Sequence, residues 1–195
     1  MTAIINKHGA LAAKLGELLK KSALLLAVAE SCTGGSLGAT LTSIAGSSAW
    51  FDRGFITYSN EAKHEMLGVS ESILAVDGAV SEKAARAMAE GCIHHSAAQL
   101  SVAITGIAGP GGGSQEKPVG TVWIACAGAR QKTTATRYCF EGDREAVRQA
   151  AELHALKMLI SRAQDYFPPK NNHEPTYFFM PIRKVYVATR LYDSL

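Results

Sequence analysis

The sequence lacks several features that would assign it to a function class at once. No apolar run approaches the roughly 20 residues of a membrane-spanning helix, and polar residues interrupt the first 21 positions, which is untypical of a signal peptide. Lys and Arg are not clustered, and the formal net charge is only +3. The four cysteines form no C-x-x-C pair, as is typical of reduced thiols. We therefore expect a cytoplasmic protein with neither nucleic acid nor a membrane as its partner.

Familiar catalytic motifs are also missing. Segment 108–118 is rich in Gly but does not match the phosphate-binding pattern G-x-x-x-x-G-K-[ST]. The turn at Ser31 does not match the G-x-S-x-G elbow of α/β-hydrolases, and no H-E-x-x-H zinc motif occurs. No histidine is well placed to act as a base for Ser31. We expect no metal site, and a serine nucleophile would need a base other than histidine.

The chain alternates between helical and extended patterns, which predicts an α/β fold. Helices are predicted over about 3–20, 34–45, 81–97 and 143–163, and a further short helix is predicted to be capped by Asn60. Strands are predicted over 23–29, 55–58, 100–104, 119–127 and 133–140. This order favours a three-layer α/β/α sandwich with a mixed sheet, because the last two strands are adjacent. We assign residues 1–165 to one domain and residues 166–195, rich in Pro and aromatic residues, to a tail outside it.

Three polar segments each follow a predicted strand: SCTGG at 31–35, YSNEAK at 58–63 and TGIAGPGGG at 105–113. Ligands of open α/β sheets bind beyond the carboxyl ends of the strands, so we expect these segments to converge. The first lies where a strand meets a helix N-terminus, whose N–H groups and dipole favour an oxyanion or a phosphate. Taken alone, the position of Ser31 favours a helix cap, and the composition of the Gly-rich segment favours a surface loop.

Two further side chains near this turn have reactive chemistry of their own. Lys63 lies in the first turn of a predicted helix, where the dipole and partial burial disfavour the ammonium form. A neutral lysine can serve as a general base for a hydroxyl, and the alternative is an ordinary solvated lysine. Cys32 offers a thiol that a helix N-terminus would activate, so cysteine chemistry is a second possibility.

Four segments in order resemble the CinA C-terminal family: AESCTGG, AGSSAWFDRGFITYSNEAK, TGIAGPGGGSQEKPVGTV and GDREAVR. The resemblance covers about residues 5–163 and is to the stand-alone bacterial members, which are nicotinamide mononucleotide deamidases. It implies hydrolysis of the nucleotide's carboxamide to nicotinate mononucleotide and ammonia, in pyridine nucleotide salvage, by a serine/lysine amidohydrolase without metal or cofactor. Ser31 falls on the family's nucleophile position and Lys63 on that of its base, while Tyr58 and Thr105 fall on polar active-site positions.

From this resemblance we expect a small nucleotide as the substrate. Ser31 would attack the amide carbon, Lys63 would accept its proton, and Tyr58 would assist in the relay. N–H groups of the following turn would hold the oxyanion, and the phosphate would bind the Gly-rich segment or Arg144. The residues predicted to bind substrate are Thr33, Gly34, Gly35, Thr105, Gly106 and Arg144. The alternative function is a non-catalytic nucleotide-binding or regulatory module.

The tail is not part of the resemblance, and we expect it to be dispensable for chemistry. It is either a loose terminus or the source of an added strand at 184–189, where β-branched and aromatic residues gather. Such a strand would pair with a neighbouring sheet edge and favour self-association. We expect a homo-oligomer.

Overall fold

The computed structural model describes residues 2–166, with side chains from residue 7 onward, so the expected tail after residue 166 lies outside the described residues. The elements in chain order are α1 (Thr2–Lys21), β1 (Leu26–Glu30), α2 (Ser36–Thr42), the 3₁₀ turn η1 (Ser47–Ala49), β2 (Phe51–Ile56), α3 (Asn60–Leu67), α4 (Glu71–Val76), α5 (Glu82–His94), β3 (Leu100–Gly106), β4 (Thr121–Gly128), β5 (Gln131–Cys139) and α6 (Arg144–Gln164). Within this part of the chain, no helix has the length and apolar character to cross a bilayer.

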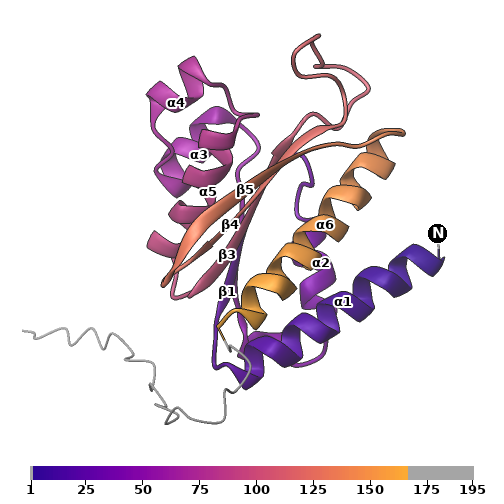
Figure 1. Cartoon of the computed structure of the whole chain (residues 1–195), viewed down its shortest axis with the longest axis vertical. Helices are drawn as coiled ribbons and strands as arrows, with labels where there is room; N and C mark the ends of the chain where they lie inside the picture. Colours follow the sequence, from indigo (N-terminus) through magenta and orange to yellow (C-terminus); the bar gives the residue numbers. More distant parts are fainter. Residues whose placement is uncertain (1, 167–195) are drawn as a thin grey trace, which may run out of the picture.

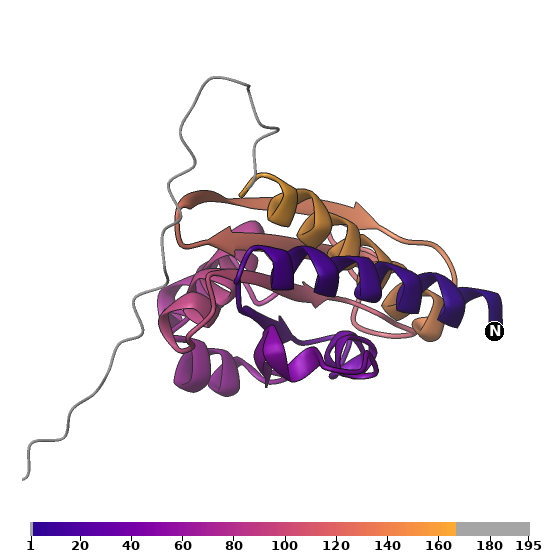
Figure 2. The ribbon, with the colours of Figure 1, turned by 90° about the horizontal axis from the view of Figure 1, so that it is seen from below.

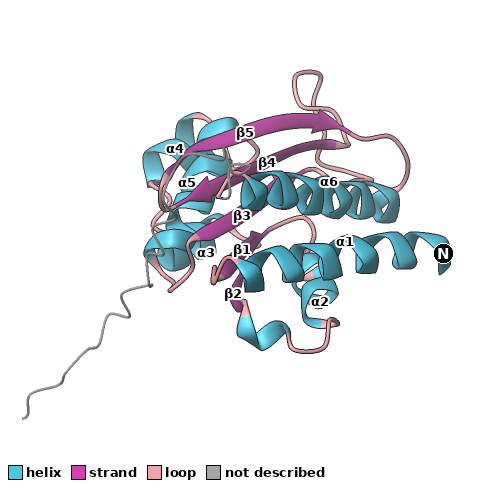
Figure 3. Ribbon diagram, turned by 60° about the horizontal axis from the view of Figure 1, so that its bottom comes forward, coloured by secondary structure: helices cyan, strands magenta, loops and turns pink. Residues whose placement is uncertain are grey.

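One mixed sheet forms the middle layer, with strand order β2-β1-β3-β4-β5. β1 pairs in parallel with β2 and with β3, whereas β4 is antiparallel to both of its neighbours. Helices α1, α2 and α6 cover one face and α3, α4 and α5 the other (Figure 1). Long helices α1 and α6 lie side by side on their face (Figures 2 and 3). The expected three-layer α/β/α sandwich with a mixed sheet is confirmed.

The two faces of the sheet carry side chains of different size, because successive residues of a strand point to opposite faces. On β1, Leu26 and Val28 join the core beneath α1, α2 and α6, while Ala27 and Ala29 join the core beneath α5. The small side chains let α5 pack close to the centre of the sheet. Because residue 30 follows Leu26 and Val28 in this alternation, it points to the same face as they do, the face covered by α2.

Several element boundaries differ from the sequence prediction. β2 runs over 51–56 instead of 55–58, because this half-exposed edge strand contains Asp52 and Arg53 and lacks an apolar alternation. Helix α3 is capped by Ser59, whose hydroxyl accepts a hydrogen bond from the N–H of Ala62, and not by Asn60. Helix α4 was not predicted, since six residues are too few to show a helical period.

Candidate active site

The carboxyl ends of the three parallel strands lie at one edge of the sheet, and a pocket of about 300 Å³ opens there. It brings together all three polar segments. The lining residues are Ser31, Cys32, Tyr58, Asn60, Lys63, Ala79, Val80, the segment 105–109, Gly111, Gly112 and Arg144. Of the predicted site residues, Thr33, Gly34 and Gly35 are not among those that line it.

Lys63 is the most deeply buried charged residue of the pocket, with a relative exposure of 1%. Its Nζ lies 3.1 Å from the hydroxyl oxygen of Ser31. The same nitrogen donates to the backbone carbonyls of Thr57, at 2.8 Å, and of Ser59, at 3.3 Å. The first turn of α3 and the residues before it thus hold the amine against the hydroxyl.

Burial has a direct electrostatic consequence for this amine. Because desolvation disfavours the ammonium form, it lowers the pKa of Lys63 below the ordinary lysine value. The charges of Cys32 and Glu61 act in the opposite direction but are smaller effects. No carboxylate forms an ion pair with Lys63 among the described residues. Burial therefore shifts the equilibrium of Lys63 toward the neutral amine, next to a serine hydroxyl.

Tyr58 and Arg144 lie at the outer part of the pocket. Tyr58 is 61% exposed, and its hydroxyl accepts a hydrogen bond from Nη2 of Arg144 at 2.9 Å. Nη1 of Arg144 donates to the carbonyl of Gly109 in the Gly-rich segment, also at 2.9 Å. Arg144 is the first residue of α6, so it connects that helix to the loops after β2 and β3. The structure shows no hydrogen bond between Tyr58 and the Ser31–Lys63 pair, within the residues it describes.

Thr105 and Gly106 form the wall contributed by β3. The Thr105 hydroxyl is buried and donates to the carbonyl of Ala79 at 2.8 Å, which leaves its lone pairs as acceptors. A Cβ at Gly106 would lie only 2.7 Å from the carbonyl oxygen of Thr121 and from Cγ2 of Val122. Gly106 is therefore required for the close approach of β3 and β4, in addition to any contact with substrate.

The N–H groups at the N-terminus of α2 are bonded within the protein, so the structure gives no support to substrate binding at Gly34 and Gly35. The N–H groups of Gly35, Leu37 and Gly38 all donate to the carboxylate of Glu30, at 2.9, 3.2 and 2.8 Å. The N–H of Gly34 donates to the carbonyl of Ser31. Both glycines have positive φ angles, 60° and 97°, so they are required by the turn itself.

Thr33 is likewise turned away from the pocket. Its side chain is fully buried, and its carbonyl accepts a hydrogen bond from Arg148 of α6 at 2.8 Å. Its hydroxyl has no hydrogen-bond partner among the described residues. Its contacts therefore hold the turn to α6.

Cys32 lines the pocket, but its surroundings disfavour the thiolate. The thiol is 6% exposed, and desolvation is the main cause that raises its pKa to about 11. Its own backbone N–H lowers the pKa, the nearby Glu30 carboxylate raises it, and Arg144 and Arg148 lower it, each by less. The activation expected for this thiol is not found, because burial outweighs the effects that lower its pKa. The hydroxyl of Ser31, in contrast, lies beside the buried amine of Lys63.

Comparison with known proteins agrees with the sequence motifs. The CinA C-terminal domain family matches residues 8–163. The chain belongs to this family. A relative from Escherichia coli strain K12, named nicotinamide-nucleotide amidohydrolase PncC, is 54% identical over 149 residues, which cover 76% of this chain and 90% of that protein. The relative of the same name from Pseudomonas putida is 46% identical over 150 residues, covering 77% and 93%.

A solved structure shows the same fold. The competence/damage inducible protein CihA from Agrobacterium tumefaciens has a TM-score of 0.78 and 44% sequence identity, and the match covers 80% of this chain and 94% of that one. A longer relative, a CinA-like protein from Syntrophobacter fumaroxidans, is 56% identical over 145 residues but only 34% of its length is matched. CinA C-terminal domains thus occur in proteins of different length.

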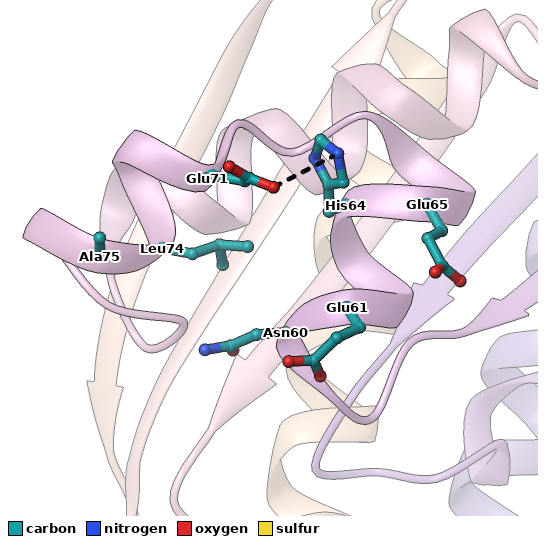
Figure 4. A pocket seen from close by; sticks show the side chains of 7 residues that line it. All are labelled: Asn60, Glu61, His64, Glu65, Glu71, Leu74 and Ala75. Carbon is teal, nitrogen blue, oxygen red and sulfur yellow. Dashed lines mark ion pairs between the residues drawn. The ribbon is translucent and has the colours of Figure 1, made fainter.

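A second and larger hollow, of about 430 Å³, lies between α3 and α4 (Figure 4). Its walls carry three glutamates and one histidine; the lining residues are Asn60, Glu61, His64, Glu65, Glu71, Leu74 and Ala75. The negative charge of this hollow would repel an anionic nucleotide, and neither Ser31 nor Lys63 lines it. Among the described residues, no group of three or more His, Cys, Asp or Glu side chains is arranged to hold a metal ion.

Sequence reasoning missed two residues that shape the site. Glu30 had no predicted role, although a carboxylate at the end of an apolar strand and just before a helix needs N–H partners. Thr57 was missed because it contributes a backbone carbonyl to Lys63, and a backbone contact leaves no signature in residue type.

Proposed function

We propose that this protein hydrolyses the carboxamide of nicotinamide mononucleotide, giving nicotinate mononucleotide and ammonia for pyridine nucleotide salvage. The relatives named nicotinamide-nucleotide amidohydrolase support the reaction class. The observation that carries the mechanism is the 3.1 Å approach of the buried Lys63 amine to the Ser31 hydroxyl. A serine and a neutral lysine are sufficient for nucleophilic catalysis at an amide.

The hydrogen bonds around Lys63 fit the role of a base. A neutral amine has two hydrogens and one lone pair. The structure has Nζ donating to the Ser31 hydroxyl oxygen and to the carbonyls of Thr57 and Ser59. In the neutral amine the two carbonyls would accept the two hydrogens, and the lone pair would then accept from the Ser31 hydroxyl. The pair is thereby oriented for proton transfer from oxygen to nitrogen.

The reaction then proceeds in two stages. As the Ser31 oxygen bonds to the amide carbon, its proton passes to Lys63, and the carbonyl oxygen becomes an oxyanion. The carbon–nitrogen bond breaks next, and Lys63 returns the proton to the departing NH₂ group, which leaves as ammonia. Lys63 then takes a proton from a water molecule that attacks the ester, and nicotinate mononucleotide leaves as Ser31 regains its proton.

The oxyanion requires a hydrogen-bond donor close to the nucleophile. The backbone N–H of Cys32 is the candidate, because Cys32 directly follows Ser31 and lines the pocket. That N–H donates to no backbone carbonyl or oxygen side chain in the part of the chain that the structure describes. The N-terminus of α2 does not take this role, since Glu30 already binds its N–H groups.

The phosphate of the substrate belongs at the outer part of the pocket, on Arg144. A guanidinium has five N–H donors, and the bonds to Tyr58 and Gly109 use two of them. The remaining donors can form charge-assisted bonds with phosphate oxygens. Gly111 and Gly112 line the pocket next to it and offer backbone N–H groups.

The decisive test measures ammonia release from nicotinamide mononucleotide by the purified full-length protein. We expect turnover by the wild type and a loss of about 10³-fold or more in kcat for Ser31→Ala. Lys63→Arg should be nearly as damaging as Lys63→Ala, because a guanidinium cannot be deprotonated in this pH range. A wild type that binds the nucleotide but releases no ammonia would favour the non-catalytic binding module instead.

The phosphate site is tested separately by comparing the nucleotide with its riboside. Loss of a charge-assisted bond costs about 1.5–3 kcal/mol, so Arg144→Ala should lower kcat/KM for the nucleotide by roughly 10- to 100-fold. The riboside should be hydrolysed poorly by both proteins and at similar rates. Arg53→Ala is the matched control, since Arg53 is an exposed arginine on β2 that bonds Asp52 and the carbonyl of His95 outside the pocket. If Arg144→Ala lowered kcat/KM equally for the nucleotide and the riboside, that result would contradict a phosphate site at Arg144.

A further inference from the structure

Glu30 is buried at the junction of β1 and the nucleophile turn. It is 1% exposed, and its carboxylate forms no ion pair with any described residue. Its carboxylate oxygens accept three backbone hydrogen bonds instead, from Gly35, Leu37 and Gly38 at the start of α2. The proposed chemistry does not use this carboxylate, although Glu30 directly precedes Ser31 in the chain.

We propose that Glu30 is a positioning residue that fixes the Ser31 hydroxyl at hydrogen-bond distance from Lys63. The turn between Ser31 and Gly35 is attached to Glu30 at both of its ends. One end is the peptide bond from Glu30 to Ser31, and the other is the bond from the N–H of Gly35 to the Glu30 carboxylate. The side chain thus closes a short ring around the nucleophile turn.

The main chain of Glu30 acts on the other member of the pair. Its carbonyl accepts a hydrogen bond from the N–H of Thr57 at 2.8 Å, and the carbonyl of Thr57 in turn accepts from Lys63 Nζ at 2.8 Å. Ser31 and Lys63 are therefore both positioned from Glu30, one through its side chain and one through its backbone. Only the first connection depends on the carboxylate.

A carboxylate is the group that matches this position. The start of a helix presents only N–H donors, and a carboxylate presents only acceptors. Glutamine has nearly the same shape but would direct an NH₂ group at one set of these N–H donors. Glu30→Gln should therefore release part of the turn without opening a cavity.

The inference rests on the proposed amidase reaction, so the experiment has one kinetic and one structural measurement. In Glu30→Gln we expect kcat to fall about 10- to 100-fold, because a misplacement of about 1 Å in a reacting group can cost this much. KM should change less than about threefold, since the proposed phosphate contacts at Arg144 are separate from the turn. Amide hydrogen exchange should show Gly35, Leu37 and Gly38 protected in the wild type and exposed to exchange in the variant.

Glu152→Gln is the matched control. Glu152 is also a buried carboxylate, 4% exposed, and it also holds α2, by accepting from the Thr40 hydroxyl at 2.5 Å, while it pairs with His8 of α1. The variant Glu152→Gln should destabilise the fold to a similar extent. It should leave kcat unchanged, and the amides of Gly35, Leu37 and Gly38 should exchange as in the wild type. Equal loss of kcat in both variants would mean that general destabilisation, and not positioning, explains the effect.

A conservative variant covers the case in which Glu30→Gln does not fold. Glu30→Asp keeps the charge but shortens the reach by one methylene, so it should retain part of the amide protection and show a smaller fall in kcat at similar KM. A normal kcat in a folded Glu30 variant whose amides have lost their protection would overturn the inference. If the wild type releases no ammonia, the proposed reaction fails, whereas the exchange data still decide whether Glu30 holds the turn.

Discussion

The lowered pKa of Lys63 has a consequence for stability that is independent of any activity assay. The residue is buried, and desolvation lowers its pKa in the folded protein. In the unfolded chain, a lysine titrates near the usual value of about 10.4. Between these two values the unfolded state holds a proton that the folded state does not. The free energy of unfolding must therefore rise with pH across this window.

The variant Lys63→Met removes this titration and keeps most of the side-chain volume. The difference in unfolding free energy, wild type minus variant, should increase by about 1.4 kcal/mol per pH unit inside the window. Above the window the wild type should be the more stable protein, by about 1–3 kcal/mol, because the variant leaves the carbonyl of Thr57 without its partner. The carbonyl of Ser59 would also lose its hydrogen bond from Lys63 Nζ, but it would keep a second bond from the backbone N–H of residue 63.

Urea denaturation of both proteins at several values between pH 7 and pH 10 measures this difference directly. Lys14→Met, at an exposed position on α1, tests whether removal of any lysine produces the same slope. A difference between wild type and Lys63→Met that stays constant over the whole range would refute the reasoning. Lys63 would then hold the same proton in both states, and it would not be a neutral base.

Three further variants test neighbouring features. Glu61→Gln removes a negative charge that raises the pKa of Lys63, so the rising limb of the profile of kcat/KM against pH should move to lower pH; movement to higher pH would contradict the assignment. Cys32→Ala should keep most of the activity, and iodoacetamide should react slowly with Cys32 at pH 8, because its pKa is raised to about 11. Gly91→Ala would place a methyl group against the carbonyl of Leu67 at the end of α3, so kcat and melting temperature should both fall. As its control, Gly9→Ala on α1 places the methyl group in open space and should stabilise the protein by about 0.5–1 kcal/mol.

The sequence was sufficient to predict the layers and the place of the pocket. Apolar periodicity identified the long helices and the central strands, and polar residues after three strands indicated where the ligand side of the sheet lies. Local position made Ser31 and Lys63 candidates, but their roles were predicted only from the resemblance to the CinA C-terminal family. These inferences depend on local patterns, which a single sequence contains.

What the sequence could not supply is the direction in which individual side chains turn within the fold. The helix N-terminus after Ser31 was predicted to be free for an oxyanion, but the nearest acceptor was the preceding residue of the strand, Glu30. Whether that carboxylate turns toward the helix or toward solvent depends on which face of the sheet it lies on. That face follows from the pairing of β1 with both of its neighbours, and strand order is not encoded in any local pattern.

The position of Glu30 also determines where the substrate's charge can be bound. A helix N-terminus that already binds a carboxylate offers no N–H groups to a phosphate, so the strongest anion site that residue order suggested is filled by the protein itself. Among the pocket residues, Arg144 is then the candidate for binding that charge, because burial lowers the pKa of Lys63 and so weakens it as a cation. In the proposed reaction Lys63 would act as a neutral amine at the carboxamide end of the substrate, and the guanidinium of Arg144 would bind its phosphate at the other end. A base that was itself the phosphate anchor would be held protonated by its ligand and could not accept a proton from Ser31.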